Sequence, residues 1–111
     1  MSGKFEMKKG KSGKFMFNLK AVNGQVILTS QTYTSKVAAK NGIESVRTNG
    51  SKDASFEQKA SKNGEPYFVL LAANKQIIGK SEMYSSKASM LNGIASVKKN
   101  APEAMVEDLA G

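Results

Sequence analysis

A tyrosine, a serine and a lysine recur together at two places in the chain, in the tetrapeptides YTSK (residues 33–36) and YSSK (residues 84–87). Both tetrapeptides lie where a helix is expected to begin. The N–H groups of a helix N-terminus, helped by a lysine, can hold a phosphate or a carboxylate, and a serine beside a lysine can act as a nucleophile with its base. The alternative is structural: the serine caps the helix, the tyrosine packs beneath its first turn and the lysine is solvated. We favour the structural role. The candidate anion-binding or ligand-binding residues are Ser35, Lys36, Ser86 and Lys87.

The rest of the catalytic repertoire is narrow, because the 111 residues include no histidine and no cysteine. Disulfides, thiolate nucleophiles, imidazole bases and metal sites built from Cys or His are therefore excluded. The nine carboxylates are not spaced as an acid–base pair or as a metal cage. We expect no catalytic residue, no metal site and no cofactor, and thus a protein that is not an enzyme.

The net charge of +8 is unevenly distributed along the chain. Residues 1–55 carry ten basic and three acidic side chains, a balance of +7, whereas residues 56–111 carry seven basic and six acidic ones, a balance of +1. A basic half can attract nucleic acid or another anionic surface. The other interpretation is a solvated face that keeps the protein soluble. Because only one basic residue is arginine, we do not expect recognition of a specific base sequence.

An internal duplication organises the chain. An ungapped alignment at an offset of 51 places residues 5–55 on residues 56–106, and about two-fifths of the aligned pairs are identical. Two copies are too few for a solenoid, so we expect two half-domains related by a pseudo-two-fold axis. The chain is then one domain over residues 1–111, with repeat one and repeat two as aligned and a C-terminal tail at residues 107–111. We expect a monomer, since the pseudo-dimer is internal.

Each repeat is expected to form three strands followed by a helix. Apolar and polar side chains alternate in three short segments of repeat one, and an Asn-Gly pair marks the last hairpin turn. These strands are expected at residues 4–9, 14–21 and 26–30. The spacing of Ala39, Ile43 and Val46 then predicts a helix. Repeat two shows the same pattern, and residues 104–109 are suited to a short terminal strand.

The predicted helices contain Asn-Gly pairs, at residues 41–42 and 92–93, where a turn would normally be expected. The apolar residues nevertheless keep helical spacing across both glycines, so each helix is expected to continue. A glycine within a helix costs about 1 kcal/mol relative to alanine. We therefore expect Gly42 and Gly93 to permit close approach of the helix to the sheet or to the other half.

The expected fold class is α+β, with two tandem β-β-β-α repeats that form one pseudo-two-fold antiparallel sheet and with both helices on one face. The side chains expected in the core are apolar residues on the inward faces of the strands and helices. They are Phe5, Phe17, Leu19, Ile43, Val46, Phe56, Phe68, Leu70, Ile94 and Val97.

The outward face of the sheet offers a second candidate site. In repeat one the outward side chains are mainly lysines, whereas the middle strand of repeat two places Tyr67, Val69 and Leu71 outward. A strand covered on both sides would explain these apolar residues without a function, but their exposure would mark a binding surface. Aromatic side chains beside positive charge also occur in proteins that bind single-stranded nucleic acid. The candidate surface patch consists of Lys8, Lys14, Met16, Lys20, Tyr67, Val69 and Leu71.

The motifs of both repeats resemble those of a known family. Repeat one contains FNLKAVNGQVILTSQTYTSKVAAKNGIESVRTN, and repeat two contains FVLLAANKQIIGKSEMYSSKASMLNGIASVKKNAPEAMVED. They are similar to the YegP-like family of small bacterial proteins of unknown function, which occur as single copies that pair or as tandem repeats. The resemblance implies two three-stranded-plus-helix units in one sheet, with C-terminal strands exchanged between the units. It supplies no active site, ligand or partner.

These features predict a small cytoplasmic binding or interaction module that is not an enzyme and whose ligand is unknown. The cytoplasmic location follows from the lack of a signal peptide and of an apolar run long enough to cross a membrane. The second hypothesis is weak, sequence-independent binding of nucleic acid by the basic first repeat. The third is an enzyme that uses tyrosine, serine and lysine at the helix N-termini. The partner is expected to be a protein or a nucleic acid and not a membrane.

Overall fold

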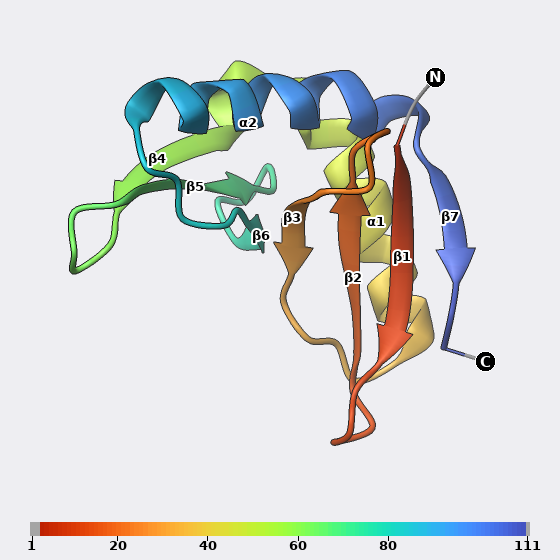
Figure 1. Cartoon of the computed structure of the whole chain (residues 1–111). Coiled ribbons are helices and arrows are strands. Elements are labelled where there is room, and N and C mark those ends of the chain that lie inside the picture. The colour runs from red at the N-terminus through yellow and green to blue at the C-terminus, as the bar shows by residue number, and fades with distance from the viewer. Residues whose placement is uncertain (1–2, 111) are drawn as a thin grey trace.

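Seven strands form one sheet, and two α-helices pack against it in a computed structural model of the chain (Figure 1). The structure describes residues 3–110, so residues 1, 2 and 111 of the expected domain lie outside the described part. In chain order the elements are β1 (Lys4–Lys9), β2 (Phe15–Lys20), β3 (Val26–Ser30), α1 (Lys36–Asn49), the 3₁₀ turn η1 (Asp53–Ser55), β4 (Phe56–Ala60), β5 (Pro66–Leu71), β6 (Ile77–Lys80), α2 (Lys87–Asn100), the 3₁₀ turn η2 (Ala101–Glu103) and β7 (Met105–Asp108). The expected α+β fold with three strands and a helix in each repeat is confirmed. Within residues 3–110 no helix has the length and apolar composition needed to cross a lipid bilayer.

The strand order in the sheet is β4-β5-β6-β3-β2-β1-β7, so each repeat contributes three adjacent strands. The repeats meet where β3 pairs with β6, with Thr29 opposite Lys80 and Ser30 opposite Gly79. Figure 1 shows that the strands of repeat two run across the direction of those of repeat one. The sheet therefore changes direction sharply at this short junction, in the manner of strongly twisted sheets.

β7 departs from the expected antiparallel sheet, because it runs parallel to β1 with Met105 opposite Lys4. The end of α2 explains this direction. The Gly3 N–H, just before β1, donates a hydrogen bond to Asn100 Oδ1, the last residue of α2, at 2.8 Å. The chain that leaves α2 thus starts beside the start of β1, and both strands run the same way. The expectation of a purely antiparallel sheet is wrong at this pair.

Both helices continue through their Asn-Gly pairs, as predicted. A Cβ added to Gly42 would meet the Tyr33 hydroxyl and lie 2.7 Å from Tyr33 Cζ. A Cβ added to Gly93 would meet the Tyr84 ring in the same way, again 2.7 Å from Cζ. The absence of a side chain at each glycine lets a tyrosine ring lie directly beneath the helix. The predicted packing role of both glycines is confirmed.

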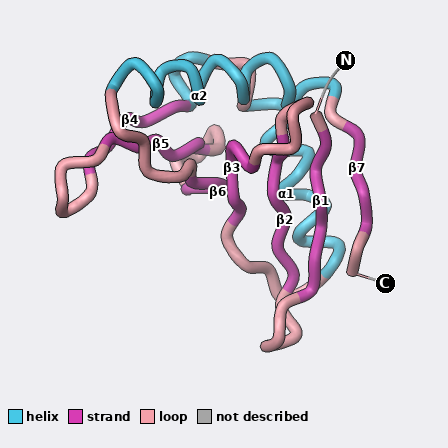
Figure 2. Tube along the Cα trace, in the orientation of Figure 1, coloured by secondary structure: helices cyan, strands magenta, loops and turns pink. Residues whose placement is uncertain are grey.

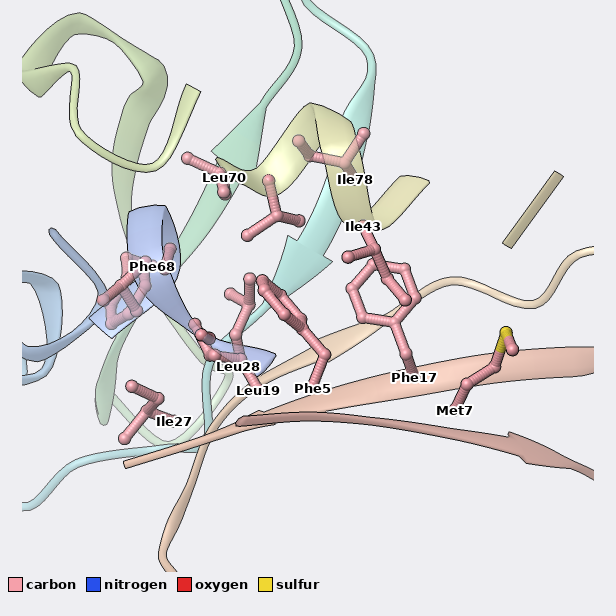
Figure 3. Packing of buried hydrophobic residues seen from close by; sticks show 14 of the residues in the cluster. Phe5, Met7, Phe17, Leu19, Ile27, Leu28, Ile43, Phe68, Leu70 and Ile78 are labelled. Atoms are coloured by element: carbon pink, nitrogen blue, oxygen red, sulfur yellow. The ribbon is translucent and has the colours of Figure 1, made fainter. Parts of the chain in front are cut away.

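The core lies between the inner face of the sheet and the two helices, and Figure 3 shows Phe5 and Leu19 close to Leu28, and Phe17 close to Ile43. Alternate residues of the strands supply one side of this cluster, and the predicted apolar stripes of the helices supply the other. The largest fully buried side chains are those of Phe5, Phe17, Phe68, Met7, Leu19, Leu28, Ile43, Leu70, Met90, Val46 and Val97.

Two of the expected core residues, Phe56 and Ile94, are only partly buried at the edge of the cluster. Their counterparts in repeat one, Phe5 and Ile43, are 0% and 1% exposed. β7 accounts for the difference, because it pairs with β1 and its Val106 lies opposite Phe5 and lines one hollow together with Ile43 of α1. β4 has no such neighbour among the described strands, so its side of the core is less covered.

Candidate functional site

The serines at the helix N-termini act as caps. Ser35 Oγ accepts a hydrogen bond from the Ala38 N–H at 3.1 Å, and Ser86 Oγ accepts one from the Ser89 N–H at 3.1 Å. Each cap satisfies a backbone donor that an anion site at the helix start would use. The capping part of the structural interpretation is therefore confirmed.

The tyrosines that precede the helices pack against phenylalanines. The Tyr33 ring stacks on Phe17 with centroids 6.2 Å apart, and Tyr84 stacks on Phe68 with centroids 6.3 Å apart. Burial raises the pKa of both tyrosines above the ordinary value. Both phenols therefore stay protonated at neutral pH, and their expected packing role is confirmed.

The lysines at the two helix starts differ. Lys36 is not solvated as expected but forms an ion pair with Asp108 of β7, with Nζ 3.0 Å from Oδ2. The hydrogen bond from Lys36 is the main cause that lowers the pKa of Asp108. Lys87 is exposed, and no residue between positions 3 and 110 forms an ion pair or hydrogen bond with its side chain.

Two of the three candidate lysines on the outer face of repeat one, Lys8 and Lys20, lie beside Glu6. The Glu6 side chain is only 8% exposed, and its oxygens lie 2.9 Å from Lys20 Nζ and 3.9 Å from Lys8 Nζ. The hydrogen bond from Lys20 is the main cause that lowers the pKa of Glu6. Lys14 is exposed just before β2, and Met16 is half-buried. The buried carboxylate offsets part of the positive charge that this face would offer to a polyanion.

The apolar residues expected on the outer face of repeat two are largely covered. Tyr67 is half-buried, whereas Val69 is 3% and Leu71 is 9% exposed. β5 lies between β4 and β6, so neither of its edges is open. Of the three residues only Tyr67 offers substantial surface.

Tyr67 and Val69 line a hollow of about 530 Å³ in this outer face. Residues from β3, β4, β5 and β6 contribute to it. They are Thr29, Ser30, Gln31, Lys59, Tyr67, Val69, Ile77, Gly79, Lys80 and Ser81.

Two lysines flank the aromatic ring at the hollow. Lys80 Nζ lies 5.0 Å from the centroid of the Tyr67 ring, close enough for a cation–π contact. Lys59, opposite Tyr67 in the β4–β5 pairing, forms an ion pair with Glu57 at 2.8 Å. The hydrogen bond from Glu57 is also the main cause that raises the pKa of Lys59. The hollow thus combines an apolar floor with two cations.

Tyr67 and Val69 were expected on this face from the sequence, whereas Lys59 and Lys80 were not identified there. Alternation along the fourth and sixth strands would have placed both lysines on the outer face. Their position beside Tyr67 depends on the register of the β4–β5 and β5–β6 pairs, which places Lys59 opposite Tyr67 and Lys80 opposite Val69.

Comparison with known proteins is consistent with this architecture. The model of a domain of unknown function, DUF1508, matches the chain twice, over residues 11–57 and 61–108. A UPF0339 protein of Mannheimia succiniciproducens is 55% identical over 107 residues, which cover 96% of this chain and 95% of the relative. The UPF0339 protein YegP of Escherichia coli K12 is 50% identical over 108 residues, which cover 97% of this chain and 98% of the relative.

Two solution NMR structures show the same fold. That of Escherichia coli YegP, described as a protein of unknown function, matches with a TM-score of 0.95 at 50% identity and covers 100% of this chain and 96% of its own. That of a UPF0339 protein from Shewanella oneidensis matches with a TM-score of 0.93 at 52% identity and covers 99% and 93%. The molecule is thus an α+β protein built from a tandem repeat. It belongs to the DUF1508 family of unknown function, and the resemblance to YegP-like proteins is confirmed.

Proposed function

We propose that this protein is a binding module without enzymatic activity and that its ligand site is the hollow on the outer face of repeat two. The observation that carries this proposal is the combination of Tyr67, Ile77 and Lys80 in one concave surface. Ligand sites are typically concave, about 300–1,000 Å³ in volume and largely apolar, with a few polar groups that orient the ligand. The hollow has these properties.

The proposed ligand is a small organic anion with a flat apolar body. Tyr67 supplies an aromatic surface for that body, and Ile77, which is 40% exposed, supplies further apolar surface. Lys59 already shares its charge with Glu57, so Lys80 is the main cation available to the anionic group. The serine and tyrosine groups that an enzyme would need at the helix starts are occupied in capping and packing, which supports a role in binding rather than catalysis.

The arrangement of the repeats supports the inferred pseudo-two-fold relation. The strand order reads β3-β2-β1 in one direction from the junction and β6-β5-β4 in the other, and β3 pairs antiparallel with β6. We infer that the axis passes through this junction. The cytoplasmic location and the monomeric state stay predictions from the sequence.

An NMR titration of the ¹⁵N-labelled protein tests the proposed site, with phenyl phosphate and benzoate as probes and inorganic phosphate for comparison. The two aromatic anions should shift the amides of Tyr67, Val69 and Lys80 in a saturable way, and inorganic phosphate should bind more weakly because it lacks the apolar body. Lys80→Gln should weaken binding about tenfold, the effect of losing one charge-assisted contact. Lys75→Gln, in the exposed β5–β6 turn, is the matched control and should leave binding unchanged.

The same titration separates this proposal from nucleic-acid binding. A single-stranded oligonucleotide that binds through the basic first repeat would shift amides near Lys8, Lys14 and Lys20, with an affinity that falls steeply with salt. Such shifts, without saturable shifts in the hollow from either aromatic anion, would favour the nucleic-acid alternative. The absence of any saturable shift at millimolar probe concentration would contradict both functions.

A further inference from the structure

β1 and β4 are equivalent first strands of the two repeats, but only β1 is covered at its outer edge. β7 pairs with β1, whereas the described strands offer β4 no partner other than β5 (Figure 2). The outer edge of β4 therefore presents a row of backbone N–H and C=O groups that no strand satisfies. Such an edge is a template for pairing with another chain.

The covalent duplication prevents the chain from filling this edge itself. β7 pairs with β1 so that Met105 lies opposite Lys4. At the repeat offset of 51 residues, the positions equivalent to Met105 and Lys4 are Ala54 and Ser55. These two residues are consecutive in the chain and therefore cannot pair across two strands. The segment Asp53–Ser55 forms a 3₁₀ turn and leads straight into β4 instead. The exchange of C-terminal strands implied by the family resemblance thus occurs in one direction only.

An apolar strip lies beside the open edge. Phe56 of β4 and Ile94 of α2 are both partly exposed. Leu91 of α2 is 43% exposed and stands where repeat one has Lys40, which lies with Val106 beside β7. The side of α2 that a strand on β4 would contact is therefore more apolar than the corresponding side of α1.

A cation without a partner lies at the end of this strip. In repeat one Lys36 binds Asp108 of β7 at 3.0 Å. Lys87 occupies the equivalent position of repeat two, and nothing in the described part of the chain pairs with it. The groove beside β4 thus repeats the backbone, apolar and charged contacts that hold β7, but without the strand.

We propose that the outer edge of β4 and the adjacent side of α2 form a docking site for an extended segment of a partner protein. The segment adds parallel to β4, as β7 adds to β1, and gains main-chain hydrogen bonds by strand addition. In the β7 register Val106 lies opposite Phe5 and Asp108 lies opposite Met7. The docked segment therefore has an apolar residue opposite Phe56 and, two positions later, an acidic residue opposite Gln58 that reaches Lys87.

The middle position of this apolar-x-acidic pattern is also constrained. In β7 it is Glu107, whose carboxylate lies 3.2 Å from Lys4 Nζ. Repeat two has Ser55 in place of Lys4, and the neighbouring side chain on this face is Glu57. A neutral or basic residue fits the middle position. The site lies on the helix side of the sheet edge and does not depend on the hollow.

A peptide with the sequence PEAMVKDLA tests the proposal. It corresponds to residues 102–110 with Glu107→Lys, and the control peptide PEAMVKKLA also carries Asp108→Lys. Added to the full-length ¹⁵N-labelled protein, the first peptide should shift the amides of β4 and of α2 from Lys87 to Ile94, in a saturable way. The control peptide should bind at least several-fold more weakly, because it lacks the carboxylate.

Two variants of the protein separate the contacts. Lys87→Glu should lower the affinity for the first peptide roughly tenfold at low salt. Lys99→Glu makes the same charge change at the far end of the same helix and should leave this affinity unchanged. Gln58→Pro should abolish binding, because it removes an N–H that faces the docked strand. By equivalence with Met7, this N–H does not take part in the β4–β5 ladder, and proline is tolerated on edge strands.

Three results would overturn the proposal. The first is no saturable shift with the peptide, and the second is shifts confined to β1 and α1, which would mean that the peptide displaces β7. The third is slower translational diffusion at higher protein concentration without peptide, together with protected β4 amides, since a second copy would then cover the edge.

Discussion

Gly42 and Gly93 lie at the middle of their helices, each above a tyrosine ring from the segment that precedes the helix. The apolar spacing around them was sufficient to predict that the helices continue. The residue that they contact was not predictable from that spacing. Tyr33 is brought beneath α1 by its backbone hydrogen bonds with Phe15, at 2.7 and 2.8 Å, and this pairing depends on how the strand edge folds.

Gly42→Ala should destabilise the protein, although alanine is the better helix former. The new Cβ would overlap the Tyr33 ring, and overpacking of this kind typically costs about 1–3 kcal/mol. Equilibrium denaturation measures the change, and Asn41→Ala at the exposed neighbouring position should stay within about 0.5 kcal/mol of the parent. Adding Tyr33→Phe to Gly42→Ala should recover part of the loss, because the hydroxyl is the closest atom. Equal stability of the two alanine variants would contradict this account of the glycine.

At the scale of elements, β7 determines how the two repeats differ. Arg47 of α1 donates a hydrogen bond to the Ala104 carbonyl at 2.6 Å, and the Leu109 N–H donates one to the Met7 carbonyl at 2.8 Å. The sequence predicted a short terminal strand, but the expected antiparallel sheet gave the wrong direction for it. Direction depends on where α2 ends relative to β1, which is a contact between residues 97 positions apart.

The placement of β7, which could not be predicted, also explains why Phe56 and Ile94 are only partly buried. Alternation and helical spacing correctly placed both side chains on the inner face. How deeply they are buried depends on whether another strand covers the sheet edge beside them. The sequence of one repeat does not show that the strand after repeat two, β7, pairs with β1 of repeat one and leaves β4 uncovered.

Acid should loosen β7 through Asp108. The pKa of Asp108 is lower in the folded protein than its ordinary value of 3.8, mainly because of the hydrogen bond from Lys36. A lowered carboxyl pKa contributes stability above the ordinary value, and this contribution is lost as the pH falls through the lowered pKa. The amide shifts of β7 should therefore move toward those of an unpaired strand as the pH falls below about 4.

Asp108→Asn should remove this part of the pH dependence and leave β7 more mobile at pH 7. Glu82→Gln is the control, since Glu82 is exposed and remote from β7 in the strand order. If β7 in Asp108→Asn follows the same acid profile as in the parent, another group controls the strand.

At the scale of the whole molecule, duplication has given two similar units unequal surfaces. In repeat one β7 covers the outer edge of β1, and lysines lie beside the buried Glu6. Repeat two has an open edge, an unpaired Lys87 and the side chains that form most of the hollow. Both proposed sites lie mainly on repeat two, although repeat one carries most of the positive charge. Net charge does not show which lysines are already paired, so by itself it does not locate a site.

Amide hydrogen exchange at Met7 and Gln58 tests most directly whether the outer edge of β1 is filled and the outer edge of β4 is open. The two residues are equivalent in the repeats. The Met7 carbonyl accepts a hydrogen bond from Leu109, and the Met7 N–H faces the same strand. The account predicts slow exchange at Met7 and exchange at least about a hundredfold faster at Gln58, whose N–H faces solvent. Equally slow exchange at both amides would contradict the open edge.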